Sequence, residues 1–343
     1  MILVLVAMLE TGFSIEKIQT EYEEEQVSAG NISNATVILG GMPVGIYMKT
    51  DGVLVLGTDE IEAEDGLKYE PAKNLLREGD YIVGINGKEV MTKNQLVLQV
   101  SKLDSPEAIL KIRREGEVIQ VKMNAVKVAE QRYKLGVWVK DSMQGLGTIT
   151  YLDEDGEFAA LGHGIYDTDS SDLLEIRDGR LYQTDILGVK KGVKGSPGGI
   201  EGVIIYNSRN YLGQIEQNTD LGIYGKLEEV NSVVEEERRV PVANKKEIEI
   251  GKASIYCTVG ENIEEYEVEI EQIDFYPREQ NKGMVIRITD ESLLEKTGGI
   301  VQGMSGSPII QDGKLVGAVT HVLVNDPTRG YGIFIENMLE AAG

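Results

Sequence analysis

The chain has very little of two residue types that build metal and redox sites. It contains one cysteine, Cys257, so it can form neither an internal disulfide nor a zinc site made of several cysteines. Its two histidines are His163 and His321, and neither has a second histidine four residues further on, the spacing of helical zinc sites. We therefore expect no metal and no other cofactor, and a metal-dependent hydrolase is not favoured.

Positive charge is scarce as well. The 343 residues include 34 Lys and Arg but 57 Asp and Glu, which gives a formal net charge of −23 at pH 7. Proteins that bind nucleic acids carry clusters of Lys and Arg for the phosphates, and this chain lacks them, so we expect no nucleic-acid partner. Basic peptides and polar proteins are favoured as partners instead.

The chain opens with an apolar run over residues 1–9 that is too short to cross a bilayer as a helix, which takes about 20 residues. The run also lacks a basic flank. We interpret residues 1–40 as the remnant of a signal or anchor segment, able to associate with a membrane, followed by an acidic stalk around "EYEEEQ". The alternative is that the apolar run forms a buried first strand.

The length predicts two domains, at roughly 150 residues each. In residues 41–128, "LLREGDYIVGINGKEV" predicts a strand from Asp80 and a tight turn at Asn86-Gly87, "TKNQLVLQVSKL" predicts a helix, and residues 108–126 predict a hairpin. This order resembles a PDZ domain, a small α+β module that binds peptides. In "PVGIYM", the segment Val44, Gly45 and Ile46 resembles the loop that holds a peptide's terminal carboxylate on backbone N–H groups. The alternative for these three residues is an ordinary strand entry.

Residues 129–343 contain many short apolar runs separated by glycine-rich turns. This pattern predicts a β-barrel or sandwich, and the fold class of the whole chain is therefore mainly β with a small α+β module.

A nucleophile and a base are both suggested by the sequence of this second domain. Ser305 lies in "GMSGSP", a tight turn before a strand pattern, and a serine hydroxyl becomes a nucleophile when a neighbouring imidazole removes its proton. His163, at the end of the strand pattern in "GEFAALGHGIYD", is the first candidate for that base. His321 is second, because its apolar neighbours favour a packed histidine.

The hexad "GMSGSP" is similar to the G-x-S-G-x-P pattern of chymotrypsin-like serine proteases, in which the N–H groups of Gly303 and Ser305 would form the oxyanion hole. That superfamily places histidine, acid and serine in this order along the chain. Asp290 is one candidate for the acid, and a helix N-cap before "ESLLEK" is its alternative role. Its rivals are Asp167, Asp169 and Asp185, and spacing does not decide among them.

A PDZ module followed by a domain with "ALGHGI" and "GGIVQGMSGSP" resembles the stage IV sporulation protein B family of serine endopeptidases from spore-forming Firmicutes. The resemblance extends from about residue 40 to the end. It implies a PDZ domain over residues 41–128, a chymotrypsin-like double β-barrel over residues 129–343, and a triad of His163, Asp290 and Ser305.

The resemblance also implies a biological role. The enzyme would act in the space between the two forespore membranes, process itself, and cleave a regulator of an intramembrane metalloprotease, which releases processing of the sigma factor K precursor. The PDZ ligand would be the tail of a partner or a second copy of the chain. The alternative is a non-catalytic PDZ scaffold on a protease-like barrel.

Overall fold

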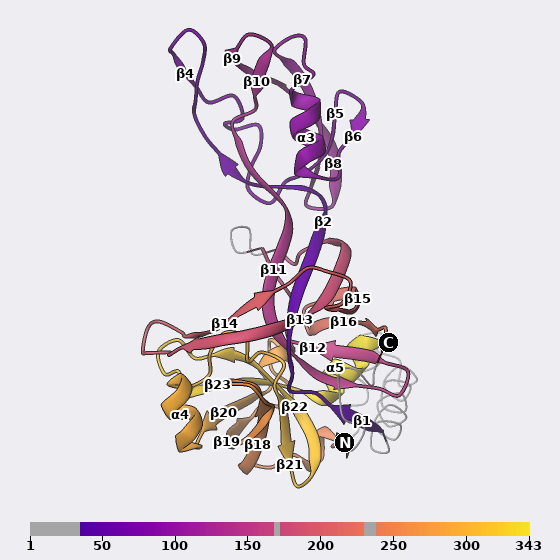
Figure 1. Ribbon diagram of the computed structural model, residues 1–343, viewed down its shortest axis with the longest axis vertical. Coiled ribbons are helices and arrows are strands. Elements are labelled where there is room, and N and C mark those ends of the chain that lie inside the picture. Colours follow the sequence, from indigo (N-terminus) through magenta and orange to yellow (C-terminus); the bar gives the residue numbers. More distant parts are fainter. Residues whose placement is uncertain (1–34, 168–171, 230–237) are drawn as a thin grey trace, which may run out of the picture.

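The computed structural model describes residues 35–167, 172–229 and 238–343. It shows two β-barrels side by side and a smaller module joined to them by a pair of long strands (Figure 1). The predicted anchor segment and acidic stalk fall mostly on residues 1–34, which lie outside the described residues. In the described ranges no helix is long and apolar enough to cross a membrane.

The first barrel is a ring of antiparallel strands in which each pairs with the next and β11 closes the ring onto β2. Its core is a cluster of buried apolar side chains that includes Ile46, Ile149, Leu161 and Leu181. β1 and β17 extend the sheet beyond β11, and β14 pairs with β13. The strands are β1 (Thr36–Leu39), β2 (Pro43–Thr58), β11 (Val137–Leu152), β12 (Glu157–Ala160), β13 (Ile176–Lys190), β14 (Gly199–Ile204), β15 (Tyr211–Thr219), β16 (Gly222–Leu227) and β17 (Arg239–Pro241).

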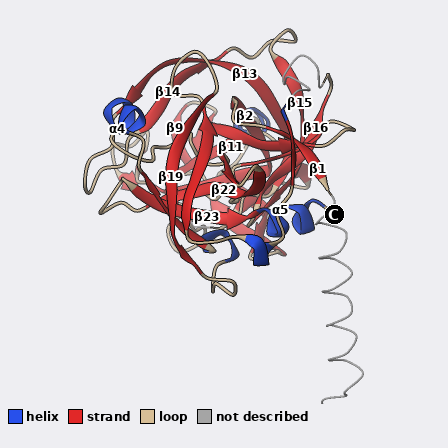
Figure 2. Ribbon diagram, turned by 90° about the horizontal axis from the view of Figure 1, so that it is seen from below, coloured by secondary structure: helices blue, strands red, loops and turns tan. Residues whose placement is uncertain are grey.

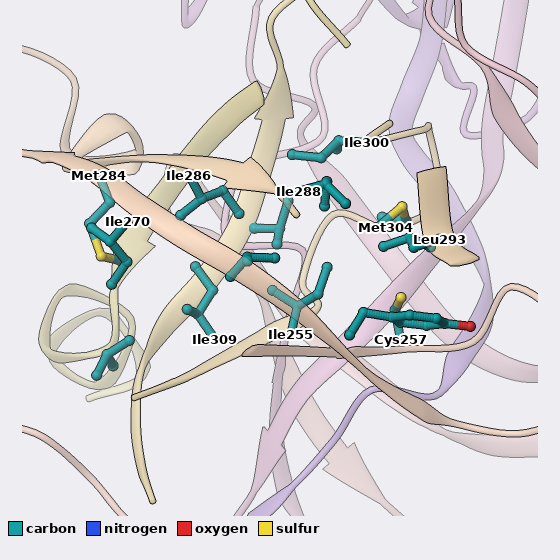
Figure 3. Close-up of a cluster of buried hydrophobic side chains, with 14 of the residues drawn as sticks. Ile255, Cys257, Ile270, Met284, Ile286, Ile288, Leu293, Ile300, Met304 and Ile309 are labelled. Atoms are coloured by element: carbon teal, nitrogen blue, oxygen red, sulfur yellow. The ribbon is translucent and has the colours of Figure 1, made fainter. Parts of the chain in front are cut away.

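The second barrel closes through six strands, in the order β18, β19, β20, β23, β22, β21. Its core is the cluster in Figure 3, which contains the single cysteine, Cys257, and Met304, the neighbour of Ser305. Helices α4 and α5 lie outside the strands (Figure 2). The prediction of a chymotrypsin-like double β-barrel is confirmed. The elements are β18 (Gly251–Cys257), β19 (Glu264–Ile273), β20 (Met284–Ile288), β21 (Pro308–Gln311), β22 (Lys314–Val322), β23 (Arg329–Phe334), α4 (Glu291–Thr297), α5 (Ile335–Ala342) and the short helices η3 (Lys245–Glu247) and η4 (Gln280–Lys282).

The module is an insertion into the first barrel. The chain leaves the barrel midway along β2 and returns midway along β11, and each of these strands is 16 residues long. The predicted helix is α3, and the predicted hairpin is β7 with β8. The module's elements are β3 (Ile61–Glu62), β4 (Lys68–Tyr69), β5 (Tyr81–Ile85), β6 (Lys88–Glu89), α3 (Lys93–Val100), β7 (Glu107–Arg114), β8 (Glu117–Asn124), β9 (Val126–Ala129) and β10 (Arg132–Lys134). The PDZ assignment itself stays a prediction.

The "GD" and "NG" pairs of the module have clear structural roles. Asp80 is 1% exposed, and its carboxylate accepts two hydrogen bonds from the Arg114 guanidinium, at 2.7 and 2.6 Å. These two parallel hydrogen bonds offset the free-energy cost of burying the Asp80 charge, and they link the start of β5 to the end of β7. Asn86 and Gly87 have φ angles of 49° and 77°, the left-handed geometry of a tight hairpin turn.

The prediction that Val44, Gly45 and Ile46 form a carboxylate-binding loop is wrong. All three lie in the inner half of β2, paired with β11 on one side and β13 on the other. These two ladders occupy the backbone N–H groups that a peptide carboxylate would need, and Val44 and Ile46 are buried in the barrel core.

The domain boundaries predicted at residues 41 and 129 are wrong as well. The inner half of β2 already belongs to the first barrel, and the module is inserted between β2 and β11 of that barrel.

We predict that Gly45→Ala lowers the free energy of unfolding by about 1–3 kcal/mol, because the new methyl group would overpack the barrel. A Cβ at this position would lie 2.6 Å from Cγ1 of Ile204, a stiff β-branched side chain. Urea denaturation measures the change. Gly188→Ala is the control, since a Cβ there meets nothing within 4 Å. Equal denaturation midpoints for the two variants would contradict the prediction.

Candidate active site

His163, Ser305 and His321 line one cavity of about 440 Å³. Most of the other lining residues come from β2 and β11, from the segment before Ser305 and from the end of β22, and Leu161, Ile165 and Pro197 complete the lining. None of the side chains that line the cavity is charged, although 27% of the chain's residues are Asp, Glu, Lys or Arg. Apolar side chains dominate it, among them Met143, Leu146, Ile300, Val322 and Val324.

Ser305 is presented in a tight turn between α4 and β21. Gly303 and Gly306 have φ angles of 100° and 94°, which side chains rarely adopt, so glycines are required on both sides of the serine. The Ser305 hydroxyl donates a hydrogen bond of 2.7 Å to the main-chain oxygen of Thr320. The hydroxyl must therefore turn before its proton can pass to an imidazole.

His163 lies just after β12, where Leu161 and Gly162 adopt φ angles of 72° and 69° and turn the chain out of the strand. Its Nδ1 lies 2.8 Å from the main-chain oxygen of Gly164. A carbonyl oxygen can only accept, so Nδ1 carries the proton and Nε2 keeps the lone pair that a general base needs. Burial lowers the pKa of His163 below 6.5, and the bond to Gly164 opposes that effect.

His321 packs against His163. The two ring centroids are 4.6 Å apart, with the ring planes at 36°. Burial, with a smaller contribution from His163, lowers the pKa of His321 to about 4, so this ring is neutral at pH 7. His321 therefore supports one side of the His163 ring as a neutral partner.

Two backbone donors are left for an oxyanion. The Gln302 oxygen accepts from the Ile200 N–H at 2.8 Å, and the Met304 oxygen accepts from the Ser307 N–H at 2.9 Å. In a trans peptide the N–H points opposite to the carbonyl, so these bonds direct the N–H groups of Gly303 and Ser305 away from Ile200 and Ser307. Within the described residues neither N–H donates to another group of the chain, and both residues line the cavity.

The structure does not bring Asp290 to the cavity. Asp290 is the N-cap of α4: its carboxylate accepts from the Leu293 N–H at 2.9 Å and the Ser292 hydroxyl at 2.6 Å. Burial alone would raise the pKa of Asp290, but hydrogen bonds from Ser292, Leu293 and the backbone outweigh it and hold the pKa below its usual value. The capping role, which the sequence left open, is the one observed.

The rival acids are not placed against His163 either. Asp167 is buried in an ion pair with Lys140, Asp185 lies exposed on β13, and Asp169 falls outside the described residues.

Sequence reasoning did not single out Asp220, which lies in the turn between β15 and β16 and contacts the segment that follows His163. Its main-chain oxygen accepts from the Gly164 N–H at 3.2 Å, and its carboxylate accepts from the Tyr166 hydroxyl at 2.7 Å. The only sequence signal is an acid in a turn between two predicted strands.

We predict that Asp290→Asn leaves kcat/KM for peptide cleavage within about threefold of wild type, because Asn caps a helix about as well as Asp. Steady-state kinetics on one peptide substrate would test this. Replacing the acid of a working triad by Asn costs about 10⁴-fold in kcat, so a loss of that size would show that Asp290 orients His163 during catalysis. Thermal unfolding of Asp290→Asn should also match wild type.

We predict that kcat/KM falls on the acid side with a midpoint below pH 6.5. The base must be neutral, and burial lowers the pKa of His163, so half of the base is protonated only below the ordinary histidine value. A pH profile of kcat/KM measures the midpoint. A midpoint at or above pH 6.5 would contradict a buried His163 acting as the base.

Three solved structures with remote similarity to this chain are each below 15% identity. The Rv3671c protease from M. tuberculosis, active form, is 12% identical with a TM-score of 0.34, covering 59% of this chain and 73% of that one. The HtrA-type protease AlgW with decapeptide is 10% identical with a TM-score of 0.35, covering 92% and 65%. Human heparin binding protein is 12% identical with a TM-score of 0.29, covering 57% and 84%.

Sequence comparison gives a more specific result. No curated protein matches this chain. The sequence profile described as SpoIVB peptidase S55 matches residues 131–339, which span most of the first barrel and all of the second, together with both histidines and Ser305. The matched region is more than half of the chain, and the chain is therefore a serine endopeptidase that belongs to the SpoIVB peptidase S55 family.

Proposed function

We propose that this serine endopeptidase is a signalling enzyme of sporulation. It processes itself and cleaves a protein regulator of an intramembrane metalloprotease, which leads to processing of the sigma factor K precursor. It acts in the space between the forespore membranes, with its N-terminus associated with a membrane. Membership of the SpoIVB peptidase family supports this role.

The observation that carries the catalytic part is the meeting of Ser305, a His163 ring in the base tautomer, and two free N–H donors in one cavity. His163 Nε2 takes the hydroxyl proton as Ser305 Oγ attacks the carbonyl carbon of the scissile bond. The N–H groups of Gly303 and Ser305 hold the oxyanion. His163 then protonates the leaving amine, and water, activated by the same imidazole, releases the acyl group from Ser305.

The substrate chemistry follows from the lining of the cavity. A charged side chain entering this site would lose water without meeting an opposite charge, which is costly. Uncharged apolar side chains would instead bury surface against Met143, Leu146, Val322 and Val324. The protein substrate therefore presents apolar residues beside its scissile bond.

The module is the part of the chain that would select partners. β8 lies at the end of its sheet and pairs only with β7 among the described strands, so an extended peptide can add to its other edge. The ligand is the tail of a partner or a second copy of the chain. Either one would raise the local concentration of the scissile segment at the barrels.

We predict that purified wild type forms discrete N-terminal products over time, whereas Ser305→Ala and His163→Ala stay intact, because each lacks one half of the nucleophile and base pair. Mass spectrometry of the intact proteins follows the reaction. Addition of a candidate regulator tests cleavage between molecules. Equal processing of wild type and Ser305→Ala would exclude Ser305 as the nucleophile and favour the non-catalytic scaffold.

We predict that the cleaved bonds in a peptide library lie next to apolar residues, and that Asp or Lys at the preferred position lowers kcat/KM by more than about tenfold. Liquid chromatography with mass spectrometry identifies the products. Val322→Asp should reduce cleavage of the apolar peptides and improve that of Lys-containing ones. Preferred cleavage beside acidic residues by wild type would contradict an apolar site.

A further inference from the structure

Thr148, on β11, makes hydrogen bonds to both segments that supply the reacting groups, the turn of Ser305 and the segment before His163. Its hydroxyl donates to the Gly303 oxygen at 2.8 Å, and its N–H donates to the Ser305 oxygen at 3.0 Å. Its own oxygen accepts from the Leu161 N–H at 3.2 Å, two residues before His163. Thr148 is 2% exposed, so water does not compete for these bonds.

The turn around Ser305 needs such a restraint because its glycines give it many alternative conformations. The peptide group between Gly303 and Met304 lies between the two oxyanion donors, and a rotation of this group would move both. Two hydrogen bonds hold it: Met304 N–H to the Val301 oxygen at 3.1 Å, and the Thr148 hydroxyl to the Gly303 oxygen. Among the described residues, Thr148 supplies the one side chain that hydrogen-bonds a main-chain oxygen of residues 303–305.

The packing leaves little freedom at this contact. A Cβ at Gly306 would lie 2.0 Å from the Thr148 oxygen and 2.6 Å from the Leu161 nitrogen. The serine turn of the second barrel therefore touches the same backbone atoms of the first barrel that lead to His163. A shift of β11 at Thr148 would change the position of Ser305 relative to the imidazole.

We propose that Thr148 is a positioning residue, whose hydroxyl sets the orientation of the oxyanion donors and the placement of Ser305 against His163. This proposal rests on the proposed peptidase mechanism. It differs from a purely structural role in one measurable respect. Loss of the hydroxyl should weaken binding of the transition state, which uses the oxyanion donors, and leave binding of the ground state nearly unchanged.

The test compares Thr148→Val, which keeps the shape and removes the hydroxyl, with Thr148→Ser, which keeps the hydroxyl. Thr150→Val is the matched control: Thr150 is two residues further along β11, is fully buried, and donates to the Gly306 oxygen at 2.8 Å. Each variant is titrated with a fluorophosphonate, so that rates refer to folded active sites. kcat, KM and inhibition by a peptide aldehyde, which mimics the tetrahedral oxyanion, are then measured.

We expect Thr148→Val to lower kcat about 10- to 100-fold, to weaken the aldehyde by a similar factor, and to change KM less than about twofold. Thr148→Ser should recover most of the activity, and Thr150→Val should resemble wild type. Equal kinetics for Thr148→Val and Thr150→Val, or a change confined to KM, would overturn the proposal. Thr148→Cys, a weak donor of similar size, replaces the Val variant if that one does not fold.

The same measurements distinguish a failure of the proposed peptidase mechanism from a failure of the proposed role of Thr148. If wild type itself shows no activity that depends on Ser305, the peptidase mechanism is wrong, and the role of Thr148 is refuted with it. If wild type is active through Ser305 and Thr148→Val is equally active, the mechanism stands and only the positioning role is refuted.

Discussion

The hydrogen bonds between β11 and the turn that carries Ser305 are the contact on which the active site depends. The nucleophile comes from the second barrel and the base from the first, so the chemistry requires one fixed relation between the two barrels. β11 provides it at Thr148, whose hydroxyl and N–H donate to the Gly303 and Ser305 oxygens. The outer half of the same strand pairs with β2 in the module (Figure 1). The module is therefore built on the same strand that contacts the serine turn.

Among the residues that the structure describes, no carboxylate is hydrogen-bonded to His163. The Gly164 oxygen fixes the tautomer of His163, and the ring of His321 packs against one side of the imidazole. A main-chain oxygen sets the direction of the ring but adds no negative charge to stabilise an imidazolium. Together with a Ser305 hydroxyl that donates to Thr320, this describes a resting arrangement whose base is competent and whose nucleophile has still to turn.

The sequence predicted correctly those structural features that are determined by one short segment. Local spacing determines the "GMSGSP" turn, the end of β12 at His163, and the α3 and β7–β8 elements. Many short strand patterns with glycine-rich turns predicted a β-barrel or sandwich, and the resemblance to a family implied the double barrel. Predictions from the sequence were wrong where contacts between distant segments determine the structure. Val44 to Ile46 read alone resemble a binding loop, and only pairing with β11 and β13, about 100 and 140 residues away, shows a barrel strand. The place of Asp220 beside Gly164 likewise depends on a tertiary contact, whereas the cap role of Asp290 is local and was one of the two roles that the sequence offered.

The mechanism requires that Ser305 and His163 are the nucleophile and the base of one site. A peptide chloromethyl ketone with apolar residues would test this pairing, because such a reagent bonds to the serine and alkylates the histidine that serves it. Peptide mapping by mass spectrometry then locates the modified imidazole. We expect alkylation of His163 that disappears in Ser305→Ala. Alkylation of His321 in its place, or equal labelling with and without Ser305, would contradict it.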